Sequence, residues 1–455
     1  MQKYFSYMQE ALAEFIWGPP MLAVFLFTGV LFTLRSGLFP FRRLALWLNV
    51  TFGSLLRKQP AAAEGSISQR QALTSALAAC LGTGNIVGVA TALQLGGPGA
   101  VFWMWVSAAF GMMTCCAENI LGVKYRWRTA NGGWMGGPMA YLERGLKSKK
   151  LAGVYAVLLS LASFGIGNMT QANAIAEAAQ QSLRLPPLAT GFIVAVLTAL
   201  VIFGGVTRIA KLTERLIPFM TILFLLACVI VIAKNSKRLP SVLTQIVTEA
   251  FRVRSVAGFG MFKAMRFGIA RGVFSNEAGL GSSAVIHAAA DVKEPTEQGM
   301  WGIAEVFIDT LLMCTVTALT FLCAGVWQPD GATGAPTGAP TGVSLASASF
   351  SGVFGAWGGH FISFSIAVFA FATLTGWSFY GEQGTRYLFG ETGASAYRIC
   401  FVAVIILGCT LRLETVWGVS DIFNGLMAIP NLIGVLALSG VVVREMKRYE
   451  SRLLR

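Results

Sequence analysis

Charged side chains are scarce in this sequence. Asp, Glu, Lys and Arg make up 12% of its 455 residues, whereas a typical soluble domain carries about 25%. Hydrophobic residues make up 55%, and the mean hydropathy is +0.65. So few charges cannot cover a water-facing surface, which excludes a soluble enzyme and a disordered protein. The 51 glycines suit helices that pack closely in lipid, so we predict an all-α polytopic membrane protein.

Histidine is nearly absent, and the cysteines form no Cys-x-x-Cys pair. The sequence has 2 histidines and 8 cysteines, and the cysteines lie in apolar stretches, where we interpret them as small packing residues. This pattern argues against a structural metal site, a disulfide framework and a set of catalytic residues. No organic cofactor is expected.

The net charge of +14 does not come from a basic domain. Lys and Arg fall in short clusters between apolar stretches, for example Arg42-Arg43, Arg57-Lys58 and the segment 444–455. Because aromatic residues are not interleaved with these clusters, they do not indicate a nucleic-acid-binding surface. We interpret them as anchors that face anionic lipid headgroups.

Eleven apolar windows are long enough to span a membrane as helices, which takes about 20 residues. Alternate connections between them differ in Lys and Arg, with 24 in one set and 8 in the other. The positive-inside rule then places the N-terminus outside and the C-terminus in the cytoplasm. The windows are 16–34, 73–95, 99–122, 152–175, 189–206, 214–233, 260–286, 300–326, 355–380, 397–412 and 421–443.

Two connections stand out from the rest. The connection 234–257 carries five cations on the predicted outer side, and one interpretation is an amphipathic element lying on that surface. The segment from Gln328 to about Ser351 repeats Gly-Ala-Pro-Thr and has no cation. Its composition predicts a flexible outer loop, to which we assign no function.

Two of the windows suit an unbroken helix poorly. The second contains Gly82-Thr83-Gly84-Asn85, and the seventh contains several glycines beside Asn276 and Glu277, where we expect the break at 272–277. Glycine costs about 0.8–1.0 kcal/mol relative to Ala inside a helix, so both windows are predicted to unwind. Close packing through small residues is the alternative interpretation. A carboxyl at this depth, which costs about 2.5–3.5 kcal/mol on insertion scales, favours a functional break.

The positions of the two breaks predict an inverted repeat. Once the first window is set aside, the broken helices are the first and the sixth of ten, so each opens a unit of five helices with opposite orientations. Matching interrupted helices are typical of secondary-transporter binding sites. We expect one transport domain over 1–455, with an extra helix at 16–34 and repeats at 73–233 and 260–443.

Five motifs in the same order resemble the alanine or glycine:cation symporter family. They are 82–85, 96–105, 167–173, 272–283 and 305–310, and the resemblance runs over nearly the whole chain from about residue 70. It implies a LeuT-type inverted repeat with one added N-terminal helix. It also implies Na⁺-driven import of alanine or glycine across the inner membrane of a bacterium or archaeon, and a transporter rather than an enzyme.

The resemblance assigns residues to the substrate. Backbone N–H groups at the first break would bind the carboxylate, and Gln171 would contact the amino acid directly. Phe274 and Trp377 would form an apolar wall that leaves little room beyond a methyl group, although ordinary core packing is the alternative for aromatic rings. Helix–helix hydrogen bonding is the alternative role for Asn168 and Asn173. The predicted substrate-binding residues are Gly82, Thr83, Gly84, Gln171, Phe274, Asn276 and Trp377.

The predicted Na⁺ ligands are oxygen atoms, which suit a hard cation. The resemblance places Asn85 at a Na⁺ site beside the substrate. Asp309, a carboxyl deep in the eighth window, is our preferred extra ligand. The resemblance also implies a second site, formed by carbonyl groups just before the first break and by hydroxyls of the ninth window. The predicted ligands are Ala78, Leu81, Asn85, Asp309, Thr373 and Ser378.

Three carboxyls within the apolar windows have open or local roles at this point. Glu305 and Asp309 lie four residues apart on one helix face, and ion coordination, proton relay and structural hydrogen bonding are all compatible with them. Glu118 is expected to pair with Lys124 or Arg126.

We therefore expect a Na⁺-coupled importer of small neutral amino acids that works by alternating access. A proton-coupled carrier of the same fold would use Glu305, Asp309 or Glu277 as the proton carrier. An ion channel would need a repeated pore lining, and a membrane enzyme would need a catalytic set, whereas His287 and His360 fall near segment ends. The expected partners are the amino acid and membrane lipid, with no nucleic acid and no obligate protein partner.

Overall fold

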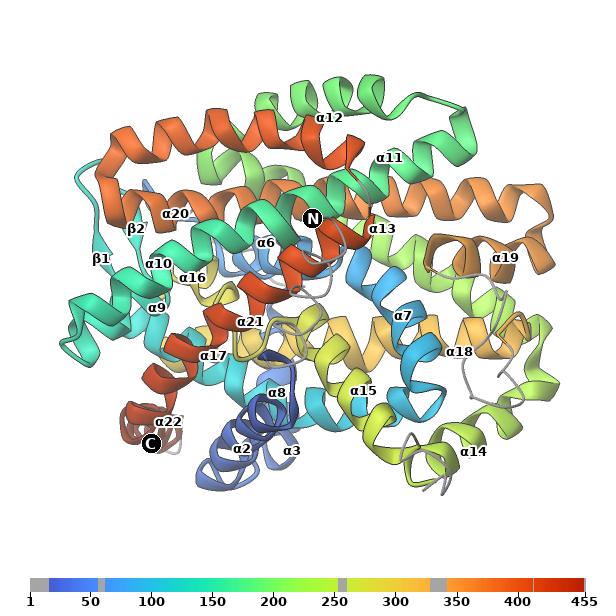
Figure 1. Ribbon diagram of the computed structural model, residues 1–455. Helices are drawn as coiled ribbons and strands as arrows, with labels where there is room; N and C mark the ends of the chain where they lie inside the picture. Colours follow the sequence, from blue (N-terminus) through green and yellow to red (C-terminus); the bar gives the residue numbers. More distant parts are fainter. Residues whose placement is uncertain (1–15, 56–61, 253–259, 328–341, 412, 454–455) are drawn as a thin grey trace.

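The computed structural model describes residues 16–55, 62–252, 260–327, 342–411 and 413–453, and these are almost entirely helical (Figure 1). A single antiparallel hairpin within the described residues joins β1 (Trp127–Arg128) to β2 (Trp134–Met135). In the first half of the chain the helices are α2 (Pro19–Arg35), α3 (Phe39–Arg42), α4 (Leu44–Val50), α5 (Phe52–Leu55), α6 (Gln69–Cys80), η1 (Thr83–Asn85), α7 (Val87–Gly96), α8 (Gly99–Lys124), α9 (Pro138–Ala140), η2 (Tyr141–Gly145), α10 (Lys149–Phe164), η3 (Gly165–Met169), α11 (Thr170–Leu183), α12 (Pro187–Ile202) and α13 (Gly205–Lys234). In the second half they are η4 (Ser236–Arg238), α14 (Leu239–Ala250), α15 (Met261–Asn276), α16 (Ser283–His287), α17 (Pro295–Val306), η5 (Phe307–Cys314), α18 (Thr315–Ala324), α19 (Gly342–Phe354), α20 (Ala356–Thr410), α21 (Leu413–Ala437) and α22 (Ser439–Leu453).

Six of the described helices are long and apolar enough to cross a membrane, and a seventh span results when α6 is joined to the segment Thr83–Gly96. The predicted class is therefore confirmed: the chain is a multi-pass helical membrane protein. The helix α20 covers most of two predicted windows, 355–380 and 397–412. Gly390, with φ 67° and ψ −159°, interrupts the helix between them. Figure 1 shows α20 turning back along itself after crossing the molecule.

Both breaks are present, and the second lies later than predicted. The first separates α6 from α7 around a 3₁₀ turn and bends the span by 60°. The second lies between Asn276 and Ser283, while residues 272–276 remain helical. The reason is close packing: a Cβ on Gly268 would lie 2.3 Å from the Ala100 carbonyl oxygen, and one on Gly272 would lie 2.6 Å from Ser107 Oγ. These two glycines let α15 approach α8, as the small-residue interpretation proposed.

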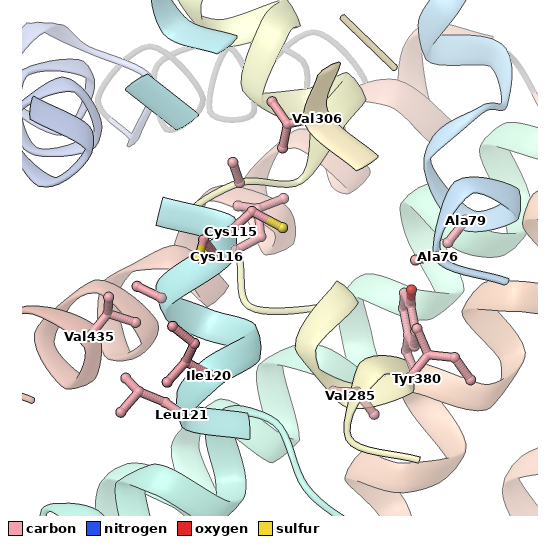
Figure 2. Close-up of a cluster of buried hydrophobic side chains, with 14 of the residues drawn as sticks. Ala76, Ala79, Cys115, Cys116, Ile120, Leu121, Val285, Val306, Tyr380 and Val435 are labelled. Atoms are coloured by element: carbon pink, nitrogen blue, oxygen red, sulfur yellow. The ribbon is translucent and has the colours of Figure 1, made fainter. Parts of the chain in front are cut away.

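Parts of α6, α15 and α16 beside the breaks belong to one buried apolar cluster. Figure 2 labels Ala76 and Ala79 of α6, Cys115 of α8, Val285 of α16 and Tyr380 of α20, all within or against this cluster. None of these five residues is more than 3% exposed. The breaks therefore face protein, as unwound backbone at membrane depth must.

The two unusual connections form helices in their described parts. Residues 342–351, predicted as loop, belong to α19, so that prediction is wrong for them, while 328–341 lie outside the described residues. Apolar side chains at Val343, Ala346 and Phe350 are spaced to form one buried helical face. The connection 234–257 contains α14, whose Val242, Ile246 and Ala250 are buried, which agrees with an amphipathic element.

Several of the basic clusters pair with the last helix. Arg43 Nε lies 2.8 Å from Glu450 Oε1, Lys124 Nζ lies 2.7 Å from Glu445 Oε1, and Arg452 pairs with Glu294. The amphipathic α22 is therefore held against α3, α8 and the start of α17, so these cations bind protein carboxylates in addition to any lipid contact. Surface pairs of this kind contribute about 0–1 kcal/mol each.

Candidate functional site

The first break is built around Gly82 and Gln171. A Cβ on Gly82 would lie 2.5 Å from Thr373 Oγ1 and 3.0 Å from Gln171 Oε1, so only glycine fits. The Thr83 N–H donates to Gln171 Oε1 over 3.3 Å, and Gln171 Nε2 donates to the Ile166 carbonyl over 3.0 Å. That second bond exists because η3 is a π-helical turn beside α11. It turns the amide oxygen of Gln171 toward the break.

The other two amides near Gln171 act between helices. Asn168 Nδ2 donates to the Phe401 carbonyl over 2.7 Å, and Asn173 Nδ2 donates to the Leu411 carbonyl over 2.8 Å. Both bonds hold α11 and η3 against the second half of α20. The helix–helix role is therefore confirmed for these two residues, and Gln171 alone of the three contacts the first break in the bonds described.

Two predicted Na⁺ ligands, Thr373 and Ala78, come together at the end of α6, just before the break. Thr373 Oγ1 donates to the Ala78 carbonyl over 2.8 Å, and a Cβ on Gly376 would lie 3.2 Å from the Ala79 nitrogen, so α20 packs closely on α6. Ser378 behaves differently. Its Oγ donates over 2.6 Å to the Thr375 carbonyl of its own helix, and no described contact joins it to Ala78.

A polar cluster lies on the other side of the break. Asn85 Nδ2 donates to Asp309 Oδ1 over 2.7 Å, Ser275 Oγ donates to the same oxygen over 3.1 Å, and Thr310 Oγ1 donates to Asp309 Oδ2 over 2.7 Å. All four side chains are at most 2% exposed. The cluster joins η1, α15 and η5, three elements far apart in sequence. Sequence reasoning missed Ser275, although it stands directly before the predicted Asn276.

Two side-chain oxygens at the first break are buried without a hydrogen-bond partner. They are Asn85 Oδ1 and Thr83 Oγ1. Buried polar atoms are normally satisfied, so unpaired oxygens beside a break are candidate contacts for a ligand or a buried water. The amide, hydroxyl and carboxylate oxygens gathered here are the ligand atoms that a hard cation such as Na⁺ prefers.

The second break is held by side chains from the surrounding helices. Glu277 accepts from Trp377 Nε1 over 2.9 Å and from the Ser282 hydroxyl. Asn431 Nδ2 donates to the Gly279 carbonyl over 2.8 Å, and Tyr155 donates to the next carbonyl, at residue 280, over 3.0 Å. These bonds satisfy carbonyl groups that the unwound segment leaves without helical partners.

Glycine is required twice in this segment. Gly279 has φ 96° and Gly281 has φ 75°, a region that side chains rarely adopt. A Cβ on Gly279 would also lie 2.5 Å from the ring of Phe25, and one on Gly281 would lie 2.5 Å from Asn431 Oδ1. Glu277 itself has φ 58°, an uncommon value for a residue with a side chain.

The remaining predicted substrate residues are buried. Asn276 Nδ2 donates to Thr310 Oγ1 over 3.0 Å, and its Oδ1 accepts from the Ala278 N–H over 3.0 Å. Phe274 is 4% exposed and Trp377 fully buried, and the Trp377 ring lies against Gly167, where a Cβ would be 2.3 Å from the Trp377 Cβ. Their contact with a substrate stays a prediction.

The predicted partners of Glu118 are wrong. Its carboxylate is 1% exposed and accepts from Asn431 Nδ2, while Lys124 pairs with Glu445. Arg126 donates to carbonyl groups of the segment after α16, including those of Ala288 and Ala290 at 2.6 Å each, and burial lowers its pKa to about 10. Glu118 points into the bundle, away from the helix end where the cations lie.

A cavity of about 600 Å³ lies between α6 and α13. Apolar residues including Leu73, Leu77 and Ile217 line most of it, and an Arg70–Glu214 ion pair lies at its margin. Ser75 and Thr213 form a hydrogen bond of 3.0 Å between the same two helices. Leu77 directly precedes Ala78, so the cavity adjoins the part of α6 that leads to the first break.

Comparison with known proteins gives one family. Residues 2–454 match the model of the sodium:alanine symporter family. The sodium/alanine symporter AgcS of Methanococcus maripaludis is 44% identical over 442 residues, which cover 96% of this chain and 95% of that protein. The probable sodium/glutamine symporter GlnT of Bacillus subtilis is 36% identical, over 99% of this chain and 91% of that protein. A putative sodium/proton-dependent alanine carrier protein of Bacillus subtilis, YrbD, is 32% identical, over 96% and 90%.

Solved structures share the fold at low identity. MhsT in complex with L-phenylalanine matches with a TM-score of 0.57 at 13% identity, covering 84% of this chain and 98% of that one. A mutant of the manganese transporter of Eremococcus coleocola matches with a TM-score of 0.51 at 14% identity, covering 84% of this chain and 82% of that one. These likenesses show the LeuT-like fold expected from the motifs.

Proposed function

The chain belongs to the sodium:alanine symporter family, and we propose that it imports alanine or glycine together with Na⁺ by alternating access. Membership makes it an amino-acid:cation symporter and a transporter rather than an enzyme. The proposal carries this further to the substrate, the coupling ion and the residues that bind them.

We propose eleven membrane spans with five in each inverted repeat. The seven spans described above are completed by α2, by α12, by the α15–α16 pair and by the second half of α20. The extra helix at 16–34 and the repeats at 73–233 and 260–443 follow from this count. The excess of Lys and Arg on alternate connections supports a cytoplasmic C-terminus and an outside N-terminus in the inner membrane of a prokaryote.

The amino acid is proposed to bind at the first break. Backbone N–H groups of Gly82, Thr83 and Gly84 would donate to its carboxylate, at the positive end of a helical segment. For Gly82 and Thr83 the carboxylate would replace the present acceptors, the Cys80 carbonyl and Gln171 Oε1. The Gln171 amide oxygen already points at this segment and can accept from the ammonium group. Phe274, Asn276 and Trp377 would border the side chain.

The unpaired oxygens at the first break are the observation that carries the sodium proposal. Asn85 Oδ1, the Asp309 carboxylate and Ser275 Oγ form one proposed Na⁺ site. The Ala78 and Leu81 carbonyls with Thr373 Oγ1 form a second. Ser378 remains a proposed ligand of this second site, although its hydroxyl now donates along its own helix.

Counterflow in proteoliposomes tests the proposal directly. The purified protein should exchange labelled alanine or glycine in the presence of Na⁺, and longer or charged amino acids should compete poorly. Without Na⁺, and with an imposed pH gradient, accumulation should be absent. Robust accumulation under those conditions would show a proton-coupled carrier instead, with the buried carboxyls as its proton sites.

A further inference from the structure

A buried histidine and glutamate connect the two broken helices. His287 is the last residue of α16 and Glu305 lies on α17, and neither side chain is exposed. His287 Nε2 and Glu305 Oε2 are hydrogen-bonded at 3.0 Å, and the other ring nitrogen, Nδ1, contacts the amide of Gln298, also on α17. The substrate and sodium sites proposed above do not use this pair.

Glu305 also reaches the first broken helix. Its Oε1 accepts from the thiol of Cys80 over 3.3 Å, and Cys80 is the last residue of α6. A second thiol, Cys115 of α8, lies 3.7 Å from Oε2. One carboxyl on α17 therefore contacts the end of the half-helix that leads into the first break and the end of the half-helix that leaves the second.

The rest of α17 is fixed against α6 and α8. Trp301 Nε1 donates over 3.1 Å to Gln69 Oε1 at the opposite end of α6. A Cβ on Gly302 would lie 2.5 Å from the Asn119 amide of α8, and one on Gly299 would lie 2.7 Å from Ile120, so α17 packs tightly on α8. The carboxyl of Glu305 thus stands on a rigid support.

The surroundings of Glu305 explain why His287 is needed beside it. A carboxyl buried without a strong hydrogen-bonding partner is strongly disfavoured in the interior. Thiols are weak donors, so His287 is the strong partner that makes Glu305 tolerable there.

We propose that Glu305 and His287 are positioning residues that set the sodium affinity at the first break by holding Cys80, and that couple this break to α16. The Leu81 carbonyl, one residue beyond Cys80, is a proposed Na⁺ ligand, so this inference rests on the proposed function. Binding sites lose affinity when ligands move by more than about 0.5 Å, and the end of α6 has the freedom of a chain about to unwind.

The central experiment removes the contact between Cys80 and Glu305 without changing Glu305 or His287. In proteoliposomes, Cys80→Ala should raise the Na⁺ concentration for half-maximal alanine uptake by about fivefold or more, the low end of coupling between sites. The alanine KM at saturating Na⁺ should stay close to that of the unchanged protein. Cys80→Ser keeps a donor for Glu305 and should restore the Na⁺ response.

Cys116→Ala is the matched control, because it removes an equally buried thiol that packs on Gly299 of the same α17. It should leave the Na⁺ response unchanged. A Cys80→Ala protein with an unchanged Na⁺ response, or a Cys80→Ser protein as impaired as Cys80→Ala, would overturn the proposal.

A double-mutant cycle tests the pair itself. Glu305→Gln and His287→Gln should each weaken the Na⁺ response, and the double variant should be no worse than the worse single variant, because two residues that act as one unit are not additive. Additive losses would contradict a shared role. If a single variant does not reach the membrane, the Cys80 series decides alone. If the unchanged protein needs no Na⁺, the proposed function fails, whereas a Na⁺-dependent protein with unaltered variants removes only this inference.

Discussion

The two breaks differ in the hydrogen bonds that hold their unwound backbone inside the membrane. The first, between Cys80 and Val87, is held by single hydrogen bonds to Gln171 and Asp309, with Thr373 bonded just before it, and it leaves two buried oxygens unpaired. The second, between Asn276 and Ser283, is held by a carboxylate, an indole, an amide and a phenol. Within it, no described side-chain oxygen is left without a partner. The first break is suited to receiving ligands, and the second to keeping its shape.

Removing the charge of Asp309 should have the largest effect on the first break. Asp309→Asn keeps the shape of the side chain but loses the anionic ligand, and we expect Na⁺ affinity to fall by at least about 100-fold, the upper end of what outer-shell changes cost at metal sites. Asn85→Ala should cost about tenfold by the same comparison. Titration of Na⁺-dependent uptake measures both. A normal Na⁺ response in either variant, with normal protein amount, would remove that residue from the ligand set.

Substitutions at Trp377 distinguish its proposed role in the pocket wall from its hydrogen bond to Glu277 in the second break. Trp377→Ala should lower stability by about 3–5 kcal/mol and admit larger side chains such as serine or valine. Trp377→Phe keeps a ring but loses the bond to Glu277, so it should lower stability without widening the substrate range. Thermal unfolding and competition by an amino-acid panel measure the two effects. If Trp377→Ala leaves selectivity unchanged, the residue is not part of the wall.

Two glycine substitutions should distinguish the breaks in the same way, with one affecting folding and the other affecting uptake. Gly281→Ala forces a side chain into the left-handed region, at about 1–2 kcal/mol before any clash, and should reduce the amount of folded protein. Gly82 has a φ of −116°, so Gly82→Ala stays out of the left-handed region but collides with Thr373 and Gln171, and it should impair uptake more than folding. Gly153→Ala is the control, because nothing lies within 4 Å of its Cβ. The opposite pattern would contradict the comparison.

The smallest expected effect concerns the amides near Gln171. Asn168→Ala loses one bond between helices, worth about 0.6 kcal/mol on average in a membrane protein, and should leave the alanine KM unchanged. Gln171→Ala should have a similar effect on stability and raise the KM. Equal KM values for the two variants would show that Gln171 is structural as well.

Much of the fold could be read from composition and order along the chain. Long apolar windows predicted the helices, and the glycine clusters at 82–84 and beside Asn276 and Glu277 predicted the two breaks. The loop prediction at 342–351 failed because a repetitive composition obscured the helical spacing of Val343 and Phe350. The second break was placed too early, because Gly272 looks the same in a sequence whether it unwinds a helix or lets two helices touch.

The candidate site divides in the same way. Asn85, Asp309, Thr373 and Ala78 were predicted, and the structure joins them in pairs through hydrogen bonds. Glu118 was misassigned because its partner Asn431 is more than three hundred positions away, and the contact between Glu305 and His287 was missed.

By itself the sequence determined that this chain crosses the membrane repeatedly, that two spans are interrupted, and to which family the motifs point. These properties depend on the local balance of apolar, charged and glycine residues, which neighbouring positions settle among themselves. Only the tertiary structure decided which buried polar groups are satisfied and which are left to bind. That outcome depends on side chains from helices distant in sequence, because a hydrogen bond forms over about 3 Å in space whatever the separation along the chain.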